Sequence, residues 1–231
     1  MNDVAVIIPA AGSGKRIGGT PKQFRLLGGE PMLHRTIKCF DGIEEIGMLV
    51  VVVPAESVAD SERALADLHP HSIVVTPGGP TRQDSVRLGL ARVRSGIQVV
   101  LVHDAARPFV SIAEIEAVIS STRQHGAAAL AIPATDTLRK SSGATLGETV
   151  DREGVYRMQT PQGFTRDLIV EAHASASRKG DTATDDVELV MLRGHAVRLV
   201  VGRSTNFKIT TAEDWTLAEA IVESAEVGGS A

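Results

Sequence analysis

Short hydrophobic runs alternate with longer amphipathic stretches along most of the chain. The runs are rich in β-branched residues, and their lengths are typical of strands buried on both faces. The predicted strands cover residues 4–8, 48–53, 72–75, 98–103 and 127–132. Helical patterns between them cover residues 32–40, 56–68, 81–94 and a stretch that begins at Ile112. Pro9 has no N–H to donate to a strand ladder, so we expect the first strand to end there.

This alternation predicts an α/β fold. Strands separated by helices of this size form a mostly parallel, twisted sheet with helices on both faces, a Rossmann-like three-layer sandwich. Ligands of such sheets bind beyond the carboxyl ends of the strands. Residues 9–14, residues 78–79 and Asp104 follow predicted strands. We therefore expect the functional site where these three segments meet.

Residues 133–158 interrupt the pattern. They are rich in serine, threonine and glycine and lack an apolar stripe, which predicts a protruding β-arm at about residues 134–157, with its tip near Ser142 and Gly143. We interpret the arm as a surface that packs on a second subunit, the alternative being a floppy surface loop. The α/β pattern then resumes with helices at 166–177 and 185–192, strands at 196–201 and 207–209, and a last helix from about Thr211.

Composition limits the class of protein. A chain of 231 residues with 43% hydrophobic content can bury one substantial core, which predicts a single domain over residues 1–231. The net charge of −4 gives no global basic field, so we expect no nucleic-acid partner. Cys39 stands alone, which excludes an intramolecular disulfide and is typical of a reducing compartment. With neither a signal-peptide pattern nor a membrane-spanning window, we expect a cytoplasmic protein with no membrane partner.

The loop after the first predicted strand has the composition of a phosphate site. Residues 10–14, Ala-Ala-Gly-Ser-Gly, leave successive N–H groups free to face an anion. The cations Lys15, Arg16 and Lys22 follow, and this arrangement suits a polyphosphate. The spacing matches neither the P-loop nor the dinucleotide fingerprint, and an ordinary glycine-rich turn with solvated cations remains the alternative.

Several motifs carry a more specific resemblance. The order small-small-Gly-x-Gly-x-Arg, followed by Pro-Lys-Gln at 21–23, resembles the signature loop of nucleotidyltransferases that activate sugars and alditol phosphates. Residues 20–24, Thr-Pro-Lys-Gln-Phe, resemble most closely the 2-C-methyl-D-erythritol 4-phosphate cytidylyltransferases. The other matching segments are 78–86, 104–108, 136–137, 152–154 with 160–162, 184–186 and 202–208.

The resemblance implies that the protein transfers CMP from CTP to 2-C-methyl-D-erythritol 4-phosphate in the non-mevalonate isoprenoid pathway, releasing pyrophosphate. It implies catalytic roles for Arg16, Lys22, Arg152 and Lys208. The implied nucleotide-binding residues are Pro9, Ala10, Ala11, Gly12, Ser13, Gly14, Gly79, Ser85, Asp104, Ala105 and Lys208. The implied acceptor-binding residues are Arg107, Thr137, Arg152, Thr160 and Thr184.

The implied cofactor is Mg²⁺ or another divalent cation, held by Asp104. A carboxylate at a strand end beside a phosphate loop suits Mg²⁺, although such an aspartate also commonly caps a turn. Some family members have an acid at the position of Thr205, so a second protein carboxylate stays open here. Pro80 lacks the N–H that a base contact from its amide would need.

We also expect a homodimer whose active sites are shared, with Arg152 and Lys22 of one site coming from different chains. Two alternative functions remain. A ribitol 5-phosphate cytidylyltransferase would share the loop and differ in the acceptor pocket. A non-catalytic nucleotide-binding protein would have no need of Arg16, Lys22, Asp104 and Lys208 together, while each cation alone is more often a solvated surface residue.

Overall fold

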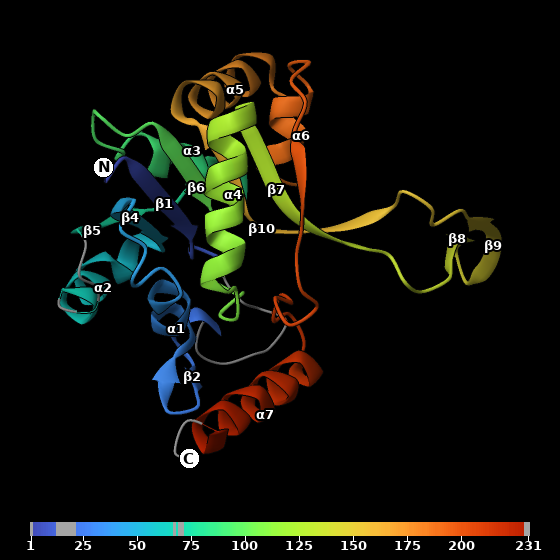
Figure 1. The fold of residues 1–231 in the computed structure, drawn as a ribbon, viewed down its shortest axis with the longest axis horizontal. Coiled ribbons are helices and arrows are strands. Elements are labelled where there is room, and N and C mark those ends of the chain that lie inside the picture. The colour runs from blue at the N-terminus through green and yellow to red at the C-terminus, as the bar shows by residue number, and fades with distance from the viewer. Residues whose placement is uncertain (1, 13–21, 67, 69–71, 229–231) are drawn as a thin grey trace.

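A seven-stranded sheet runs through the centre of the molecule in the order β11-β7-β10-β6-β1-β4-β5 (Figure 1). The structure is a computed structural model, and it describes residues 2–12, 22–66, 68 and 72–228. The sheet strands are β1 (Val4–Pro9), β4 (Ile46–Val53), β5 (Ser72–Pro77), β6 (Val99–Val102), β7 (Ala127–Pro133), β10 (Tyr156–Thr165) and β11 (Arg198–Val201). All neighbouring pairs are parallel except those of β10, which runs antiparallel to β6 and β7.

Helices cover both faces of this sheet. The α-helices are α1 (Met32–Lys38), α2 (Val58–Leu65), α3 (Arg82–Leu90), α4 (Ile112–His125), α5 (Arg166–Lys179), α6 (Asp186–Met191) and α7 (Ala212–Gly228). In the described part of the chain, the body also contains two 3-10 helices, η1 (Lys22–Phe24) and η2 (Ala55–Ser57), and a short ribbon of β2 (Leu26–Leu27) and β3 (Glu30–Pro31). No helix of the described residues has the length and apolar content needed to cross a membrane.

Alternate residues of each central strand feed two separate cores. Ile8 and Val51 face one core, with α1, α2 and α4 packed on it. Ile7 and Val52 face the other, which contains residues of α3, α5 and α6. Period-two side-chain alternation produces this division because both faces of the sheet are covered. The predicted three-layer architecture is confirmed.

Capping residues define where the helices begin. Thr81 accepts a hydrogen bond from the N–H of Asp84 at the start of α3, and Ser111 and Glu114 form a capping box at the start of α4. Thr211 and Asp214 exchange hydrogen bonds in the same way at the start of α7. These caps fix the first turns of the helices, and those of α3 and α7 lie beside the candidate active site.

The arm is a hairpin that projects away from the sheet, with its tip farthest from the body (Figure 1). Its outer part is a separate antiparallel ribbon of β8 (Leu138–Ser142) and β9 (Thr145–Val150). Ser142 pairs with Thr145 around Gly143, whose φ of 60° lies in the left-handed region that favours glycine. The predicted position of the tip is confirmed.

One predicted strand is absent from the structure, and one strand of the central sheet was missed. Residues 207–209 form no strand, because Ile209 makes one backbone bond to Ala106 and packs beside Trp215 instead of joining a ladder. Strand β10 was missed, since Pro161 interrupts its pattern. Its pairing with β7 skips from Met158 to Gln162, so the absent proline N–H breaks no bond of that ladder. The ends of the other predicted helices and strands differ from the observed ends by a few residues.

Candidate active site

A cavity of about 420 Å³, here the central cavity, opens at the carboxyl ends of β1, β5 and β6. The predicted nucleotide-binding residues among the described ones all line it. These are Pro9, Ala10, Ala11, Gly12, Gly79, Ser85, Asp104, Ala105 and Lys208. Lys22 lines it as well. Ser13, Gly14 and Arg16 lie outside the described residues.

Gln23 hydrogen-bonds to the first residues of the loop after β1. The side-chain amide of Gln23 donates to the carbonyl of Ala10 at 2.8 Å and to that of Gly12 at 3.3 Å. Because these carbonyls are fixed toward Gln23, residues 10–12 have a defined backbone conformation beside the cavity. Lys22 Nζ donates to the carbonyl of Ile209 at 2.8 Å, which ties η1 to the segment before α7. Gln23 was in the matched motif, but nothing in the local pattern pointed to this role.

The glycine turn after β5 packs closely against that loop. A Cβ on Gly78 would lie 2.3 Å from the Cβ of Ala11, so neither position tolerates a larger side chain without movement. The Ser85 hydroxyl donates to the carbonyl of Thr81 at 2.9 Å and accepts from the N–H of Gly79 at 3.2 Å. Ser85 therefore lines the cavity and also shapes the turn that borders it.

Asp104, directly after β6, is the electrostatic centre of the site. Its Oδ1 accepts from Arg82 Nε at 3.1 Å, its Oδ2 accepts from Lys208 Nζ at 2.7 Å, and Arg107 Nε lies 3.9 Å away. Burial by itself raises the pKa of this carboxyl, but Arg82, Lys208 and Arg107 together lower it well below its ordinary value. Asp104 is therefore ionised at neutral pH.

A buried histidine supports Asp104 from beneath. Burial lowers the pKa of His103 to about 4, so its ring is neutral at pH 7. Its Nε2 lies 3.0 Å from the carbonyl oxygen of Arg107. Because a carbonyl oxygen can only accept, we place the ring proton on Nε2. Nδ1 then accepts from the Thr160 hydroxyl at 3.1 Å, and Thr160 Oγ1 accepts from the Asp104 N–H at 3.0 Å. Thr160 thus fixes the backbone at Asp104.

A second cavity of about 240 Å³, here the side cavity, adjoins the first. It is lined by Arg82, Asp104, Arg107, Met158, Gln159, Thr160, Gln162, Thr184, Asp185 and Lys208. Three of the predicted acceptor residues, Arg107, Thr160 and Thr184, therefore lie together. Arg82, Asp104 and Lys208 line both cavities, so two ligands bound side by side would meet at these residues. Arg82 belongs to a matched motif, but the sequence analysis gave it no role. Its partners become apparent only in the folded chain.

Like Thr160, the other two acceptor residues of the side cavity already bond within the chain. Arg107 Nη1 donates to the carbonyl of Asn206 at 2.7 Å, and its Nη2 donates to that of Met158 at 3.2 Å. The Thr184 hydroxyl donates to the carboxylate of Glu188 at 3.0 Å. Their contact with an acceptor stays a prediction.

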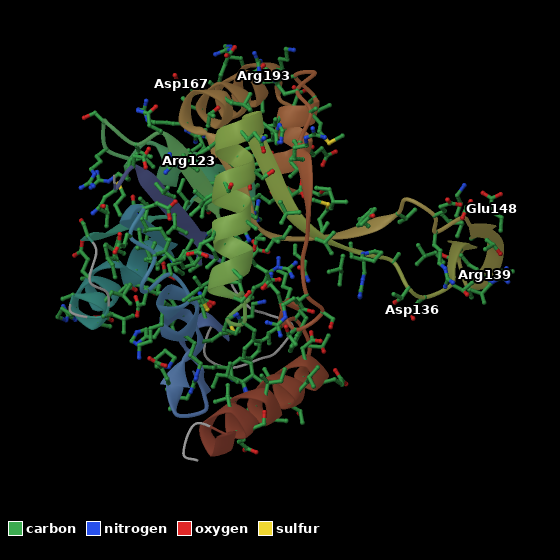
Figure 2. The ribbon with its side chains drawn as sticks, in the orientation of Figure 1. Arg123, Asp136, Arg139, Glu148, Asp167 and Arg193 are labelled. Carbon is green, nitrogen blue, oxygen red and sulfur yellow. The ribbon has the colours of Figure 1, made fainter. Side chains whose placement is uncertain are left out.

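The remaining acceptor residues, Thr137 and Arg152, line neither cavity of their own chain. Arg152 Nη1 donates to the carbonyl of Thr135 inside the arm. Figure 2 shows Asp136, the neighbour of Thr137, out on the arm, well away from the body. One chain therefore does not bring these two residues to its own cavities.

Known proteins resemble this chain over nearly its whole length. A family model described as "IspD: 2-C-methyl-D-erythritol 4-phosphate cytidylyltransferase" matches residues 4–224. A protein of Salinibacter ruber with that enzyme name is 48% identical over 219 residues, 94% of this chain and 92% of that one. The Geobacillus thermodenitrificans protein of the same name is 42% identical, covering 97% and 98%. The crystal structure of the Thermus thermophilus enzyme has a TM-score of 0.80 at 38% identity, covering 96% and 99%.

Proposed function

We propose a mechanism for this chain from one premise: it belongs to the 2-C-methyl-D-erythritol 4-phosphate cytidylyltransferase family. The enzyme transfers the cytidylyl group of CTP to 2-C-methyl-D-erythritol 4-phosphate and releases pyrophosphate, a step in isoprenoid precursor biosynthesis. One observation carries the mechanism. The central and side cavities share Arg82, Asp104 and Lys208, so two anionic substrates would meet beside the same charged groups.

CTP would occupy the central cavity. The backbone of residues 10–12 and the side chains of Lys22 and Lys208 would receive its phosphates, and Arg16 is a further candidate outside the described residues. The turn formed by Gly79 and Ser85 would border the cytosine ring. Ala11, which lines the cavity, packs closely against Gly78 in the same turn.

The acceptor would occupy the side cavity, with its phosphate near Lys208 and Arg107. One of its phosphate oxygens attacks the α-phosphorus of CTP, a new P–O bond forms, and the bond from the α-phosphorus to the β-bridging oxygen breaks. The electron pair leaves with pyrophosphate. The protein needs no covalent nucleophile for this step, so positioning and charge stabilisation supply the rate.

Asp104 is chemically suited to hold Mg²⁺. It is ionised, it lines both cavities, and Mg²⁺ typically takes one or two carboxylates together with substrate phosphates and waters. No group of three His, Cys, Asp or Glu side chains that could hold a metal ion exists among the described residues, and Asp104 is the protein ligand that we propose. When bound, the metal would neutralise charge on the nucleotide phosphates.

The arm supports a homodimer. An isolated two-stranded ribbon is marginal in water, and this arm leaves large apolar side chains exposed. Leu146 is 75% exposed at its outer ribbon, and Tyr156 and Met158 are exposed at its base. Packing on a second copy would cover them and would place Thr137 and Arg152 beside the partner's side cavity, in a reciprocal two-fold exchange.

Substrate comparison tests the function. Pyrophosphate release is measured with CTP or UTP and with 2-C-methyl-D-erythritol 4-phosphate or ribitol 5-phosphate, and the product is identified by mass spectrometry. We expect turnover with CTP and the methylerythritol phosphate. Preference for ribitol 5-phosphate would favour the alternative acceptor, and CTP binding without any turnover would favour a non-catalytic protein.

A further inference from the structure

Arg82 lies between two carboxylates that belong to different parts of the chain. As the first residue of α3, it donates from Nε to Asp104 Oδ1 at 3.1 Å and from Nη1 to Asp186 Oδ2 at 2.7 Å. Burial by itself lowers the pKa of Arg82, but the charges of Asp186 and Asp104 raise it above its ordinary value. Arg82 is therefore a permanent cation shared between the site and α6.

Asp186 touches neither cavity. Its side chain is 1% exposed, it begins α6, and it lines neither the central nor the side cavity. Its Oδ1 lies 2.9 Å from His173 Nε2, and its own N–H donates to Gln162 Oε1 at 3.2 Å. A carboxylate this deeply buried is costly unless it is paired and hydrogen-bonded. Its carboxylate bonds to Arg82, which lines both cavities, and to His173, which lines neither, so the carboxylate meets the site through Arg82.

The geometry of a guanidinium explains what that effect is. An arginine fork prefers to grip one carboxylate with two parallel N–H···O bonds. Here Asp186 engages Nη1, so the hydrogen bond from Arg82 to Asp104 runs from Nε to Oδ1. Oδ2 of Asp104 consequently remains with Lys208, which lines both cavities. Without the charge of Asp186, Asp104 is the paired carboxylate left to Arg82, and Arg82 would then donate to both oxygens of Asp104.

We propose that Asp186 is a positioning residue for cytidylyl transfer: it holds Arg82 so that Asp104 keeps one oxygen for Lys208 and the substrates. The inference rests on the proposed function of the two cavities. It assigns a role in the reaction to a residue that lines neither cavity. The buried charge of Asp186 on α6 sets the orientation of the Asp104 carboxylate.

A purely mechanical role is the rival explanation, and the chain offers a matched control for it. Gln83, the next residue of α3, binds the segment that precedes α6 through neutral hydrogen bonds. Its Nε2 donates to the carbonyl of Asp181 and its Oε1 accepts from the N–H of Ala183, each at 3.1 Å. Gln83→Ala loosens α3 from the segment before α6 without touching Arg82 or Asp104.

The first test compares Asp186→Asn with Gln83→Ala. Steady-state kcat, both KM values and the melting temperature are measured for each variant and for the wild type. Asp186→Asn should lower kcat about tenfold to a hundredfold, the range for losing a supporting partner of an active-site ligand, with each KM changed less than about threefold. Gln83→Ala should keep kcat within about twofold even if it melts earlier. An equal kcat loss in both variants would overturn the proposal.

The second test asks whether Asp186 acts through Arg82. Lysine keeps the charge at position 82 but cannot fork between two carboxylates, so Arg82→Lys should itself lower kcat by about tenfold or more. Adding Asp186→Asn should then lower kcat less than about twofold further, since residues acting through one contact are not additive. Independent, multiplying losses would overturn the proposal. If Asp186→Asn does not fold, Arg82→Lys decides alone, and near-wild-type kcat in that variant refutes it.

The wild-type enzyme separates the two possible failures. A wild type that forms no product from CTP and 2-C-methyl-D-erythritol 4-phosphate refutes the proposed function, and the inference falls with it. A wild type that turns over beside an equally active, folded Asp186→Asn variant refutes the positioning role alone.

Discussion

Lys208 Nζ donates to Asp104 Oδ2 across 2.7 Å, which joins the segment after β11 to the end of β6. Both residues line both cavities. Asp104 also pairs with Arg82, so its single negative charge is shared among several cations. These cations lie where two anionic substrates would meet. This pair is therefore the structural reason to place the chemistry at the junction of the cavities.

Lys22 should be needed for turnover rather than for folding. It lines the central cavity, and its Nζ donates to the carbonyl of Ile209. Lys22→Ala should lower kcat by about two to three orders of magnitude, the scale for losing one preorganised donor in the transition state. Saturating kinetics with a thermal melt check this, and Lys179→Ala on the exposed end of α5 is the control. Near-full turnover of Lys22→Ala would make the loop a structural turn.

Asp104→Asn should raise the Mg²⁺ concentration needed for half-maximal rate. A neutral amide binds a hard cation more weakly than a carboxylate, and no second acid stands at Thr205 to compensate. The rate is titrated with Mg²⁺, and Mn²⁺ binding in the presence of CTP is followed by electron paramagnetic resonance. An unchanged titration and unchanged Mn²⁺ binding would leave Asp104 with no role in holding the metal.

Asp214 should stabilise the protein in a pH-dependent way. Its Oδ2 accepts from the N–H of Thr210 at 2.7 Å and from that of Thr211 at 2.8 Å, and Thr210 lines the central cavity. Partial burial raises the pKa of Asp214, but these hydrogen bonds lower it below its ordinary value. A carboxyl whose folded pKa is depressed contributes stability above about pH 4 and loses it as the pH falls further.

Asp214→Ala should therefore cost about 1 kcal/mol at pH 7, as for loss of a helix cap, and lower Tm by about 2–4 °C. The difference in Tm from the wild type should shrink below about pH 4. Asp167→Ala is the control, because Asp167 lies in the first turn of α5 (Figure 2). Its side chain is 96% exposed. A Tm difference that stays constant from about pH 7 to about pH 3 would contradict the assignment.

Much of the fold could be predicted because local patterns determine it. The runs that became β1 and β4 are hydrophobic at nearly every position, and the helix start at Thr211 has its cap in the sequence. Strand β10 could not be found this way, because Pro161 breaks its local pattern. Ile209 looked like part of a strand because burial against Trp215 selects the same residue type.

The candidate site likewise contains residues that the sequence indicated and residues that it did not indicate. Gly12, Gly79 and Asp104 stand out in the sequence because their motifs follow predicted strands, and the structure brings them to one cavity. Arg82 and Asp186 did not stand out. Their roles arise from a contact between residues 104 positions apart, which no local pattern records.

The arm should complete the site of a partner subunit. Arg152→Ala and Lys22→Ala should each be inactive alone, because each removes one cation from every site. If each active site combines Lys22 of one chain with Arg152 of the other, a mixed dimer holds one intact site and one doubly damaged site. Random exchange makes about half of all dimers mixed and restores roughly a quarter of wild-type sites. Activity of the mixture is measured with subunit exchange monitored by mass; confirmed exchange without recovered activity would assign the arm to its own chain.

The fate of the acceptor's phosphate oxygens tests the central claim most directly. 2-C-methyl-D-erythritol 4-phosphate labelled with ¹⁸O in its phosphate is incubated with CTP and the wild-type enzyme, and the products are read by ³¹P NMR. Attack of the acceptor on the α-phosphorus predicts an isotope shift at that phosphorus, from a labelled bridging oxygen, and pyrophosphate without label. Labelled pyrophosphate, or a product whose α-phosphorus shows no shift, would contradict the mechanism.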